Sequence, residues 1–324
     1  MRVLIGFAIA VLVVVAVLAG MIAFGTGTAP KPMASIGNPF TKIDYRDLPR
    51  VTWIKARDGT SLATRVWTTG AAADVSRVVI AIHGSSAMGG SMHTLAKALY
   101  DAKTTVYAPD IRGHGDSGRR GDIDYSTQLD DDLADLVAEI RTVHPKATLT
   151  LLGFSSGGGY ALHAATLPLA KQFERAVLIS PMLGAFAPTA RSGPNEWVTP
   201  FIPRIIGLII LGRLGIHAFD GLTTLAFAIA PENADRLTGA YSFRLMKDFG
   251  TLDYAADLRN AQCPVSVLVG GADELFLADR FEPAIHAVRP DVPVTIVPDL
   301  GHIPMILDAR SLSAVAAAVS GRKS

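Results

Sequence analysis

Apolar residues are distributed differently in three successive parts of the chain. Val3–Phe24 is a continuous apolar run without a charged residue, and the stretch that follows it, up to Arg50, is rich in glycine and proline. From Val51 onward, short apolar runs alternate with longer stretches in which apolar residues recur at helical spacing. Such alternation is typical of a mostly parallel, twisted sheet with helices on both faces, and this is the α/β fold class that we predict.

The N-terminal run is long enough to cross a membrane. As a helix that rises about 1.5 Å per residue, Val3–Phe24 spans a ~30 Å hydrocarbon core, and it exceeds the roughly 7–15 apolar residues of a signal peptide. Arg2 favours a cytoplasmic N-terminus. We therefore expect residues 1–25 to form an uncleaved signal-anchor transmembrane helix, residues 26–50 to be a linker, and the remainder to lie on the extra-cytoplasmic side. The alternative is cleavage at Val17-Leu18-Ala19, which would give a secreted protein.

The alternating region begins with a predicted hairpin. Val51–Arg57 and Ser61–Thr68 are short strand-like runs joined at Asp58-Gly59, a strong turn signal. The first long helix is predicted at Tyr125–Val143, because its leucines share one face. Further strands are expected at Arg77–Ile82, Thr104–Ala108, Ala147–Leu152, Arg175–Ser180, Cys263–Val269 and Val292–Val297.

Residues 183–260 interrupt the alternation of strands and helices. We predict that they form a helical cap, inserted between the two parts of an α/β core, 51–182 and 261–324. Within the insertion, Ile205–Leu211 and Leu222–Ala230 are strongly apolar. This pattern is compatible with helices packed on the core and equally with an apolar roof over a functional site that also rests on the membrane.

A serine between a strand and a helix is the main candidate for chemistry. The strand Ala147–Leu152 leads into Gly153-Phe154-Ser155-Ser156-Gly157, and a helical stretch, Tyr160–Leu167, follows. In this context G-x-S-x-G holds a serine hydroxyl above a sheet edge at a strained turn, where glycine supplies the space two residues to either side. The pattern therefore predicts that Ser155 is a nucleophile.

A carboxylate and a histidine follow later strands at the same sheet edge. Asp273 comes directly after the penultimate strand, with Glu274 as the alternative carboxylate, and His302 follows the last strand. The order serine, carboxylate, histidine matches a nucleophile, the residue that orients the base, and the base itself. His83 and His114 are alternative bases, but we expect their rings to support loops.

Acyl transfer also requires two N–H donors for the oxyanion that develops during attack. One donor is the backbone amide of Ser156, which follows the nucleophile. The other should come from the loop after the strand Arg77–Ile82, and the amide of Ser85 is the candidate. Both groups belong to the backbone, so the side chains at these positions are not decisive.

Together these motifs resemble those of the α/β-hydrolase superfamily. The matching features are His83-Gly84, the sequence Arg-Gly-His-Gly-Asp-Ser-Gly at 112–118, and the serine turn at 153–157. They are most similar to the monoacylglycerol lipase, lysophospholipase and S33 serine-aminopeptidase-like group, and Asp273 fits the Gly-x-x-Asp pattern of that family. Members often carry His-Ser-Met-Gly-Gly at the turn, whereas this chain has Phe154-Ser155-Ser156-Gly157-Gly158, so its acyl pocket is expected to differ.

The resemblance implies a serine hydrolase that cleaves carboxylic esters through an acyl-enzyme on Ser155, without a metal ion or an organic cofactor. The apolar cap favours lipid-like substrates with a single acyl chain, such as a monoacylglycerol or a lysophospholipid. The alternatives are an S33-type peptidase or amidase, a short-chain esterase, an acyltransferase that excludes water, and a membrane-tethered binding module without catalysis.

Charge and cysteine content narrow the range of partners. Beyond Arg2 the numbers of basic and acidic residues are equal, which gives no support for a nucleic-acid partner. Cys263 is the only cysteine, so an intrachain disulfide and a cysteine-rich metal site are excluded. The oligomeric state has no signature in the sequence.

Overall fold

The computed structural model describes residues 1–69, 71–191 and 196–321. The strands of its main sheet are β1 (Val51–Lys55), β2 (Ser61–Trp67), β3 (Arg77–Ile82), β4 (Thr104–Pro109), β5 (Thr148–Phe154), β6 (Phe173–Ile179), β10 (Val265–Gly270) and β11 (Val294–Val297). Across the sheet their order is β1–β2–β4–β3–β5–β6–β10–β11. The pairs β1–β2 and β2–β4 are antiparallel and every following pair is parallel. The carboxyl ends of the parallel strands therefore meet at one edge.

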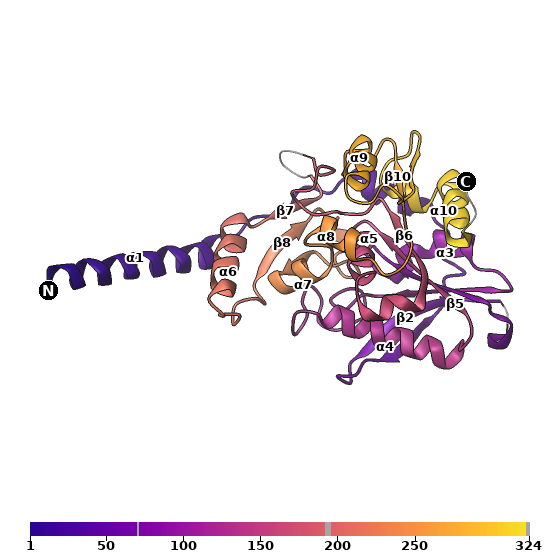
Figure 1. Cartoon of the computed structure of the whole chain (residues 1–324), viewed down its shortest axis with the longest axis horizontal. Helices are drawn as coiled ribbons and strands as arrows, with labels where there is room; N and C mark the ends of the chain where they lie inside the picture. The colour runs from indigo at the N-terminus through magenta and orange to yellow at the C-terminus, as the bar shows by residue number, and fades with distance from the viewer. Residues whose placement is uncertain (70, 192–195, 322–324) are drawn as a thin grey trace.

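Both faces of the sheet are buried because successive side chains of a strand point to opposite sides. In β3, Val78, Ile80 and Ile82 belong to one apolar cluster, whereas Val79 and Ala81 belong to the other. The helices that contribute to the first cluster include α4 (Gln128–Val143), α5 (Ser156–Ala164), α8 (Tyr254–Asn260) and α9 (Phe281–His286). Those that contribute to the second include α3 (His93–Leu99) and α10 (Ala309–Ser320) (Figure 1). The sequence predicted this arrangement of helices on both faces.

Helix α4 begins three residues later than the apolar pattern suggests. Thr127, the residue before the helix, has a left-handed backbone with φ of 72°, and its N–H donates to the carboxylate of Asp248. A residue in this conformation cannot continue a helical turn toward Tyr125. The start of the helix is therefore set by a contact with a distant segment, which the local pattern does not contain.

The insertion between β6 and β10 contains strands as well as helices. Its elements before α8 are β7 (Val198–Pro200), α6 (Ile202–Arg213), β8 (Thr223–Phe227), β9 (Ala240–Ser242) and α7 (Phe243–Asp248). The three strands form a small antiparallel sheet in the order β7–β8–β9. The apolar run Leu222–Ala230 thus contributes the central strand of a sheet, which adds to the helices predicted for this region.

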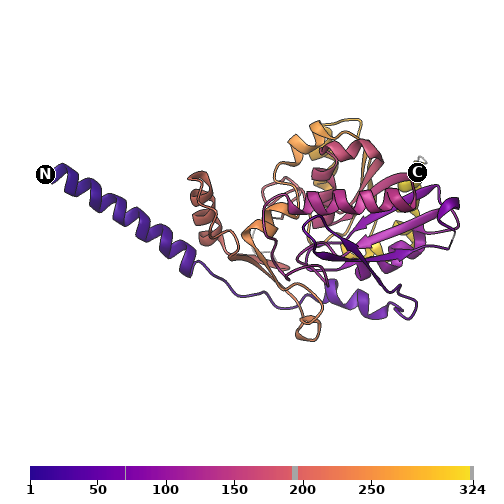
Figure 2. The same ribbon diagram turned by 90° about the horizontal axis from the view of Figure 1, so that it is seen from below.

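A long apolar helix, α1 (Arg2–Phe24), extends away from the α/β core (Figures 1 and 2). Val3–Phe24 has the length and composition of a membrane span or of a signal sequence. Its most apolar stretch is not buried against the rest of the described chain. The end of α1 contacts α6: the guanidinium of Arg204 donates from Nε to the Ile22 carbonyl at 2.7 Å and from a terminal nitrogen to the Ala23 carbonyl at 3.1 Å. These are carbonyls at the C-terminal end of α1, which have no partner within the helix.

The segment after α1 is more structured than a linker. It contains a short helix, α2 (Ala34–Gly37), and a 3₁₀ helix, η1 (Asn38–Lys42). Ile36 is only 8% exposed and belongs to the same apolar cluster as α3 and α10. Residues within 26–50, expected to be a linker, are therefore packed against the core.

Candidate active site

Ser155 occupies a strained turn between β5 and α5. Its backbone has φ of 56° and ψ of −121°, which is unusual for a residue with a side chain and costs about 1–3 kcal/mol. The flanking glycines permit the turn: a Cβ on Gly153 would lie 2.1 Å from the Gly157 carbonyl oxygen, and one on Gly157 would lie 2.3 Å from the His83 carbonyl oxygen. The two glycines of the G-x-S-x-G pattern are thus required by close backbone contacts.

His302 and Asp273 form a buried pair at the same sheet edge. Asp273 follows β10, His302 follows β11, and His302 Nδ1 lies 2.8 Å from Asp273 Oδ2. The second carboxylate oxygen accepts the amides of Leu275 at 2.9 Å and Phe276 at 3.0 Å. Because both oxygens are held, the carboxylate is fixed in its orientation toward the imidazole.

The electrostatics of this pair favour an ionised carboxylate. Burial opposes ionisation of Asp273, but the neighbouring His302 and the hydrogen bonds from that ring and from the Leu275 amide together lower the pKa of the carboxyl group. An ionised Asp273 accepts a hydrogen bond from Nδ1–H of the neutral His302 ring, so Nε2 of that ring carries no proton. The ring is thereby prepared to act as a base through Nε2.

Glu274 contacts the backbone of His302 and not its ring. Its Oε2 accepts the His302 amide at 2.8 Å. Of the two candidate carboxylates, Asp273 is therefore the one that contacts the imidazole. Glu274 instead holds the loop that carries the histidine.

Ser155 and His302 line the same cavity, which has a volume of about 790 Å³. This volume falls within the roughly 300–1,000 Å³ range of small-molecule sites. In the described part of the chain no hydrogen bond joins Ser155 Oγ to the imidazole, although apo geometry is often looser than that of a substrate complex. Among residues 1–69, 71–191 and 196–321, no group of three His, Cys, Asp or Glu side chains is arranged to hold a metal ion.

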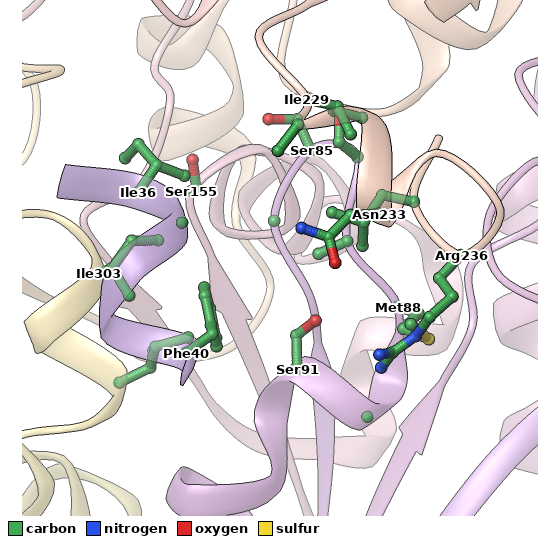
Figure 3. Close-up of a pocket in the computed structure, with 18 of the residues that line it drawn as sticks. Ile36, Phe40, Ser85, Met88, Ser91, Ser155, Ile229, Asn233, Arg236 and Ile303 are labelled. Carbon is green, nitrogen blue, oxygen red and sulfur yellow. The ribbon is translucent and has the colours of Figure 1, made fainter. Parts of the chain in front are cut away.

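The loop after β3 is held in a way that leaves the Ser85 amide available. The neighbouring Ser86 has φ of 65°, and its N–H donates to the Tyr241 hydroxyl at 2.6 Å. That amide is therefore occupied. The Ser85 side chain accepts from the indole N–H of Trp197 at 2.9 Å, and Ser85 itself lines the cavity next to Ser155 (Figure 3). The predicted oxyanion donor Ser156 is the first residue of α5. Its backbone N–H therefore has no carbonyl acceptor within the helix.

The two alternative histidines support loops. His83 is buried, its Nδ1 lies 2.8 Å from the Gly84 carbonyl, and its Nε2 accepts the Ile111 amide at 3.1 Å. His114 Nδ1 lies 3.2 Å from the Ile111 carbonyl and its Nε2 meets the Tyr241 hydroxyl. Burial lowers the pKa of both rings, so both are neutral near neutral pH. The expectation that neither ring is the base is supported by these contacts.

Several residues around the cavity were not found from the sequence. Tyr241 and Trp197 come from the inserted cap, and residues 32–48 come from the segment after α1. Conversely, no residue of the apolar run Ile205–Leu211 lines the cavity, because α6 packs against the end of α1. Of the two apolar runs expected to roof the site, only the end of the second, at Ala228–Ala230, does so.

Comparison with known proteins identifies relatives of this chain. Residues 73–306 match the protein family described as serine aminopeptidase, S33. A monoacylglycerol lipase of Mycolicibacterium smegmatis is 32% identical over 129 residues, which are 39% of this chain and 45% of the relative. A monoglyceride lipase of Rattus norvegicus is 28% identical over 173 residues, 53% of this chain and 55% of the relative. The chain thus spans about half the length of the curated relatives it matches.

Solved structures share the fold. A soluble variant of monoglyceride lipase from Saccharomyces cerevisiae has a TM-score of 0.60 at 16% identity, with 87% of this chain and 99% of that chain covered. A thermophilic esterase from Thermogutta terrifontis has a TM-score of 0.55 at 18% identity, with 84% and 97% covered. At such identities the similarity concerns the fold, and the predicted α/β-hydrolase fold is confirmed.

Proposed function

The chain belongs to the serine aminopeptidase S33 family of the α/β-hydrolase superfamily, and on this premise we propose that it cleaves carboxylic esters of lipid-like molecules that carry one acyl chain. Family membership makes it a hydrolase. The two curated relatives are lipases named for monoacylglycerol or monoglyceride, and this favours an ester over a peptide substrate. The mixed cavity, with apolar and polar walls around Ser155, supports a substrate that has an acyl chain and a polar head group.

The observation that carries the proposal is the fixed Asp273–His302 pair in the cavity that also contains the strained Ser155 turn. In the proposed reaction, His302 Nε2 removes the proton from Ser155 Oγ as that oxygen attacks the ester carbonyl carbon. The amides of Ser85 and Ser156 stabilise the oxyanion of the tetrahedral intermediate.

The second half of the reaction releases both products. When the tetrahedral intermediate collapses, the bond to the alcohol oxygen breaks, and the proton held by His302 passes to that oxygen. A water molecule then gives a proton to His302 and attacks the acyl-enzyme carbonyl. Cleavage of the bond to Ser155 Oγ releases the fatty acid and returns the proton to the serine. No step requires a cofactor.

A fluorophosphonate probe tests the nucleophile directly. Wild-type protein should be labelled and Ser155→Ala should not, because labelling requires an activated serine hydroxyl. Ser155→Ala should also lower kcat by roughly 10³–10⁶-fold while the thermal unfolding temperature is retained. Absence of labelling in the wild type would support a binding module without catalysis and overturn the proposal.

A substrate panel tests the ester class. We expect turnover of monoacylglycerols, lysophospholipids and p-nitrophenyl esters, and no comparable turnover of aminoacyl amides. A specificity constant that is highest for acetate and falls steadily with acyl length, measured below micelle-forming concentrations, would indicate a short-chain esterase. A preference for aminoacyl amides would indicate a peptidase.

We further propose that α1 is retained as a membrane anchor, with the catalytic domain on the extra-cytoplasmic side. The contact of Arg204 with the carbonyls of Ile22 and Ala23 supports retention, because cleavage before these residues would separate the apolar helix from α6. The intact mass and N-terminal sequence of the mature protein test this. An N-terminus near Gly20 would instead indicate a cleaved signal peptide and a secreted enzyme.

A further inference from the structure

The segment from Met33 to Leu48, here called the N-terminal wall, lies outside residues 73–306, which match the family. Its role therefore does not follow from family membership. Ile36 is buried, and Met33, Phe40 and Leu48 pack partly buried against the same apolar cluster. That cluster also contains core residues beside His302, so the wall is attached where the proposed base is held.

The N-terminal wall forms an apolar side of the cavity. Ile36 and Phe40 line it from the wall, and Ile303 lines it from the turn that follows His302 (Figure 3). The labelled side chain of Ser155 lies next to Ile36 in this view.

The opposite side of the cavity carries polar groups beside the apolar side chains of Ile229 and Met88 (Figure 3). Asn233 and Arg236 reach it from the cap, and Ser91 lies on the floor between the two sides (Figure 3). The polar groups of Asn233 and Arg236 thus lie across the space in front of Ser155 from the N-terminal wall. This distribution matches a molecule with an apolar chain at one end and a polar group at the other.

The N-terminal wall is fastened to the core by hydrogen bonds that run from the exposed Asp47 carboxylate to the buried His93 and Trp67 rings. The Asp47 carboxylate contacts His93 Nε2 at 3.1 Å and also pairs with the Lys97 ammonium, both on α3. His93 Nδ1 accepts the indole N–H of Trp67 at 3.2 Å. The hydrogen of the neutral ring must therefore be on Nε2, which donates it to Asp47. A second attachment runs from the Arg65 guanidinium to the Pro49 carbonyl.

We propose that the N-terminal wall is the binding surface for the acyl chain of the substrate, and that Ile36 and Phe40 set the chain length that is accepted. The side that carries Asn233 and Arg236 then receives the head group. This inference rests on the proposed ester hydrolase function and assigns one end of its substrate to a segment that lies next to α1. Because Asp47 fastens the segment to α3, the surface is present before substrate binds.

The first test introduces bulk at Ile36. Ile36→Trp should lower kcat/KM for p-nitrophenyl dodecanoate by at least about tenfold, since small changes of fit in an apolar pocket already change specificity by that amount. The loss on p-nitrophenyl acetate should be much smaller, so that the dodecanoate to acetate ratio falls, and the thermal unfolding temperature reports whether the variant is folded. Ser35→Trp is the matched control, because Ser35 is exposed, lies on the same helix and does not line the cavity. Equal losses on both esters, or no loss on either, would overturn the proposal.

The second test releases the wall without changing the cavity surface. Asp47→Asn weakens its attachment to His93 and Lys97, so dodecanoate turnover should fall while acetate turnover is retained. Asp44→Asn is the control, because among the described residues the Asp44 carboxylate pairs with Arg46 alone, on the surface. If Asp47→Asn leaves the dodecanoate to acetate ratio at the wild-type value, the fastening role is wrong.

Binding of dodecanoic acid, measured by calorimetry on the full chain, separates this proposal from the proposed function. Ile36→Trp should weaken binding by about tenfold and Ser35→Trp should not. Wild-type protein that binds the acid in this way but hydrolyses no ester would contradict the enzymatic function alone. Wild-type protein that hydrolyses esters but binds the acid equally well in both variants would contradict the wall alone.

Discussion

Asp273 and Glu274 are adjacent carboxylates that hold different parts of the same histidine. The first meets the imidazole Nδ1 and the second accepts the backbone amide. The first contact fixes the tautomer and stabilises a positive charge on the ring, whereas the second only positions the loop. Two neighbouring residues of similar chemistry therefore have separable roles.

A pair of amide substitutions separates these roles. Asp273→Asn should lower kcat by roughly 10⁴-fold, because an amide at this position favours the wrong tautomer of His302. Glu274→Gln retains an oxygen acceptor for the amide and should lower kcat much less. Steady-state kinetics on one soluble ester measures both, with thermal unfolding as the check on folding. Similar losses from the two variants would contradict the assignment of Asp273.

Tyr241 connects the cap to the loop that carries Ser85. Its hydroxyl accepts the Ser86 amide and meets His114 Nε2, whose other nitrogen is held by the Ile111 carbonyl. Because His114 Nδ1 is the donor in that last contact, Nε2 can only accept, and the tyrosine hydroxyl donates to it. Each group in this chain thus donates to the next, from the Ser86 amide through the Tyr241 hydroxyl to the His114 ring.

Tyr241→Phe should change both stability and turnover. It leaves the Ser86 amide buried and unpaired, which costs about 1–3 kcal/mol in the free energy of unfolding. A displaced Ser85 amide should lower kcat by up to roughly 10²-fold with little change in KM. Tyr107→Phe is the matched control, because the Tyr107 hydroxyl also contacts a histidine, His144, whereas the Tyr241 hydroxyl also holds the loop that carries Ser85. The prediction is wrong if the control loses as much kcat as Tyr241→Phe.

At the scale of elements, helix α5 is held to its neighbours through His163. Its Nε2 lies 3.4 Å from an Asp130 oxygen on α4, and its Nδ1 lies 3.9 Å from an Asp257 oxygen on α8. The hydrogen bond to Asp130 and the nearby carboxylate of Asp257 raise the pKa of His163 from 6.5 to about 10. The folded state thus holds this proton more tightly than the unfolded chain does.

Stability should therefore depend on pH through His163. Its contribution is full below about pH 6.5, declines as pH rises and is lost above about pH 10, since the folded pKa is the higher one. The effect is on the order of 1 kcal/mol or less, because the ring is partly exposed. His163→Gln should lower the unfolding temperature near neutral pH, and the difference from wild type should vanish at high pH. His286→Gln, on α9, is the control for loss of a histidine. A difference in unfolding temperature between His163→Gln and wild type that does not change with pH would contradict the prediction.

The elements that were predictable from the sequence are those with a local signal. β3 and β5 are apolar runs, α4 has an apolar face, and the turn at Ser155 requires glycines on both sides. The family and the fold followed from these motifs and are confirmed by the comparisons. The position of Asp273 and His302 after β10 and β11 also follows from the order of strands.

The features that were not predictable depend on contacts between distant segments. Tyr241 lies in a three-residue strand, and no periodicity marks it as a partner of the loop after β3. Ile36 lies among glycines and prolines, which locally indicate a linker. Conversely, the apolar run Ile205–Leu211 was compatible with a roof over the site and equally with a helix packed on the core, but Arg204 and the end of α1 fix α6 elsewhere. Hydrophobicity alone predicts that a segment is buried, but it does not predict which part of the molecule the segment packs against.

At the scale of the whole molecule, α6 presents an apolar face beside the proposed membrane anchor. Leu208 packs into a small cluster with Ile22 of α1, and Gly207 lies against the same residue. The exposed side chains Ile202, Ile206, Ile209 and Ile210 recur at helical spacing, and Leu214, Ile216 and Phe219 extend the patch. In both views α6 runs across the direction of α1 (Figures 1 and 2). If α1 crosses the bilayer, α6 lies along its surface, where an apolar stripe is stabilised by acyl chains.

Lipid contact of α6 can be measured with one engineered cysteine. The native Cys263 is buried, and burial raises the pKa of its thiol to about 11, so it reacts slowly with a thiol-directed fluorophore. In full-length protein reconstituted into vesicles, a label at Ile209→Cys should be quenched by lipids that carry a quencher on the acyl chain. A label at Glu139→Cys, exposed on α4 in the core, should not be. Equal quenching at the two positions would mean that α6 does not rest on the membrane. If energy transfer between labelled Ile209→Cys chains persists when the vesicles are diluted with lipid, the apolar face of α6 binds a second copy of the protein instead of the membrane.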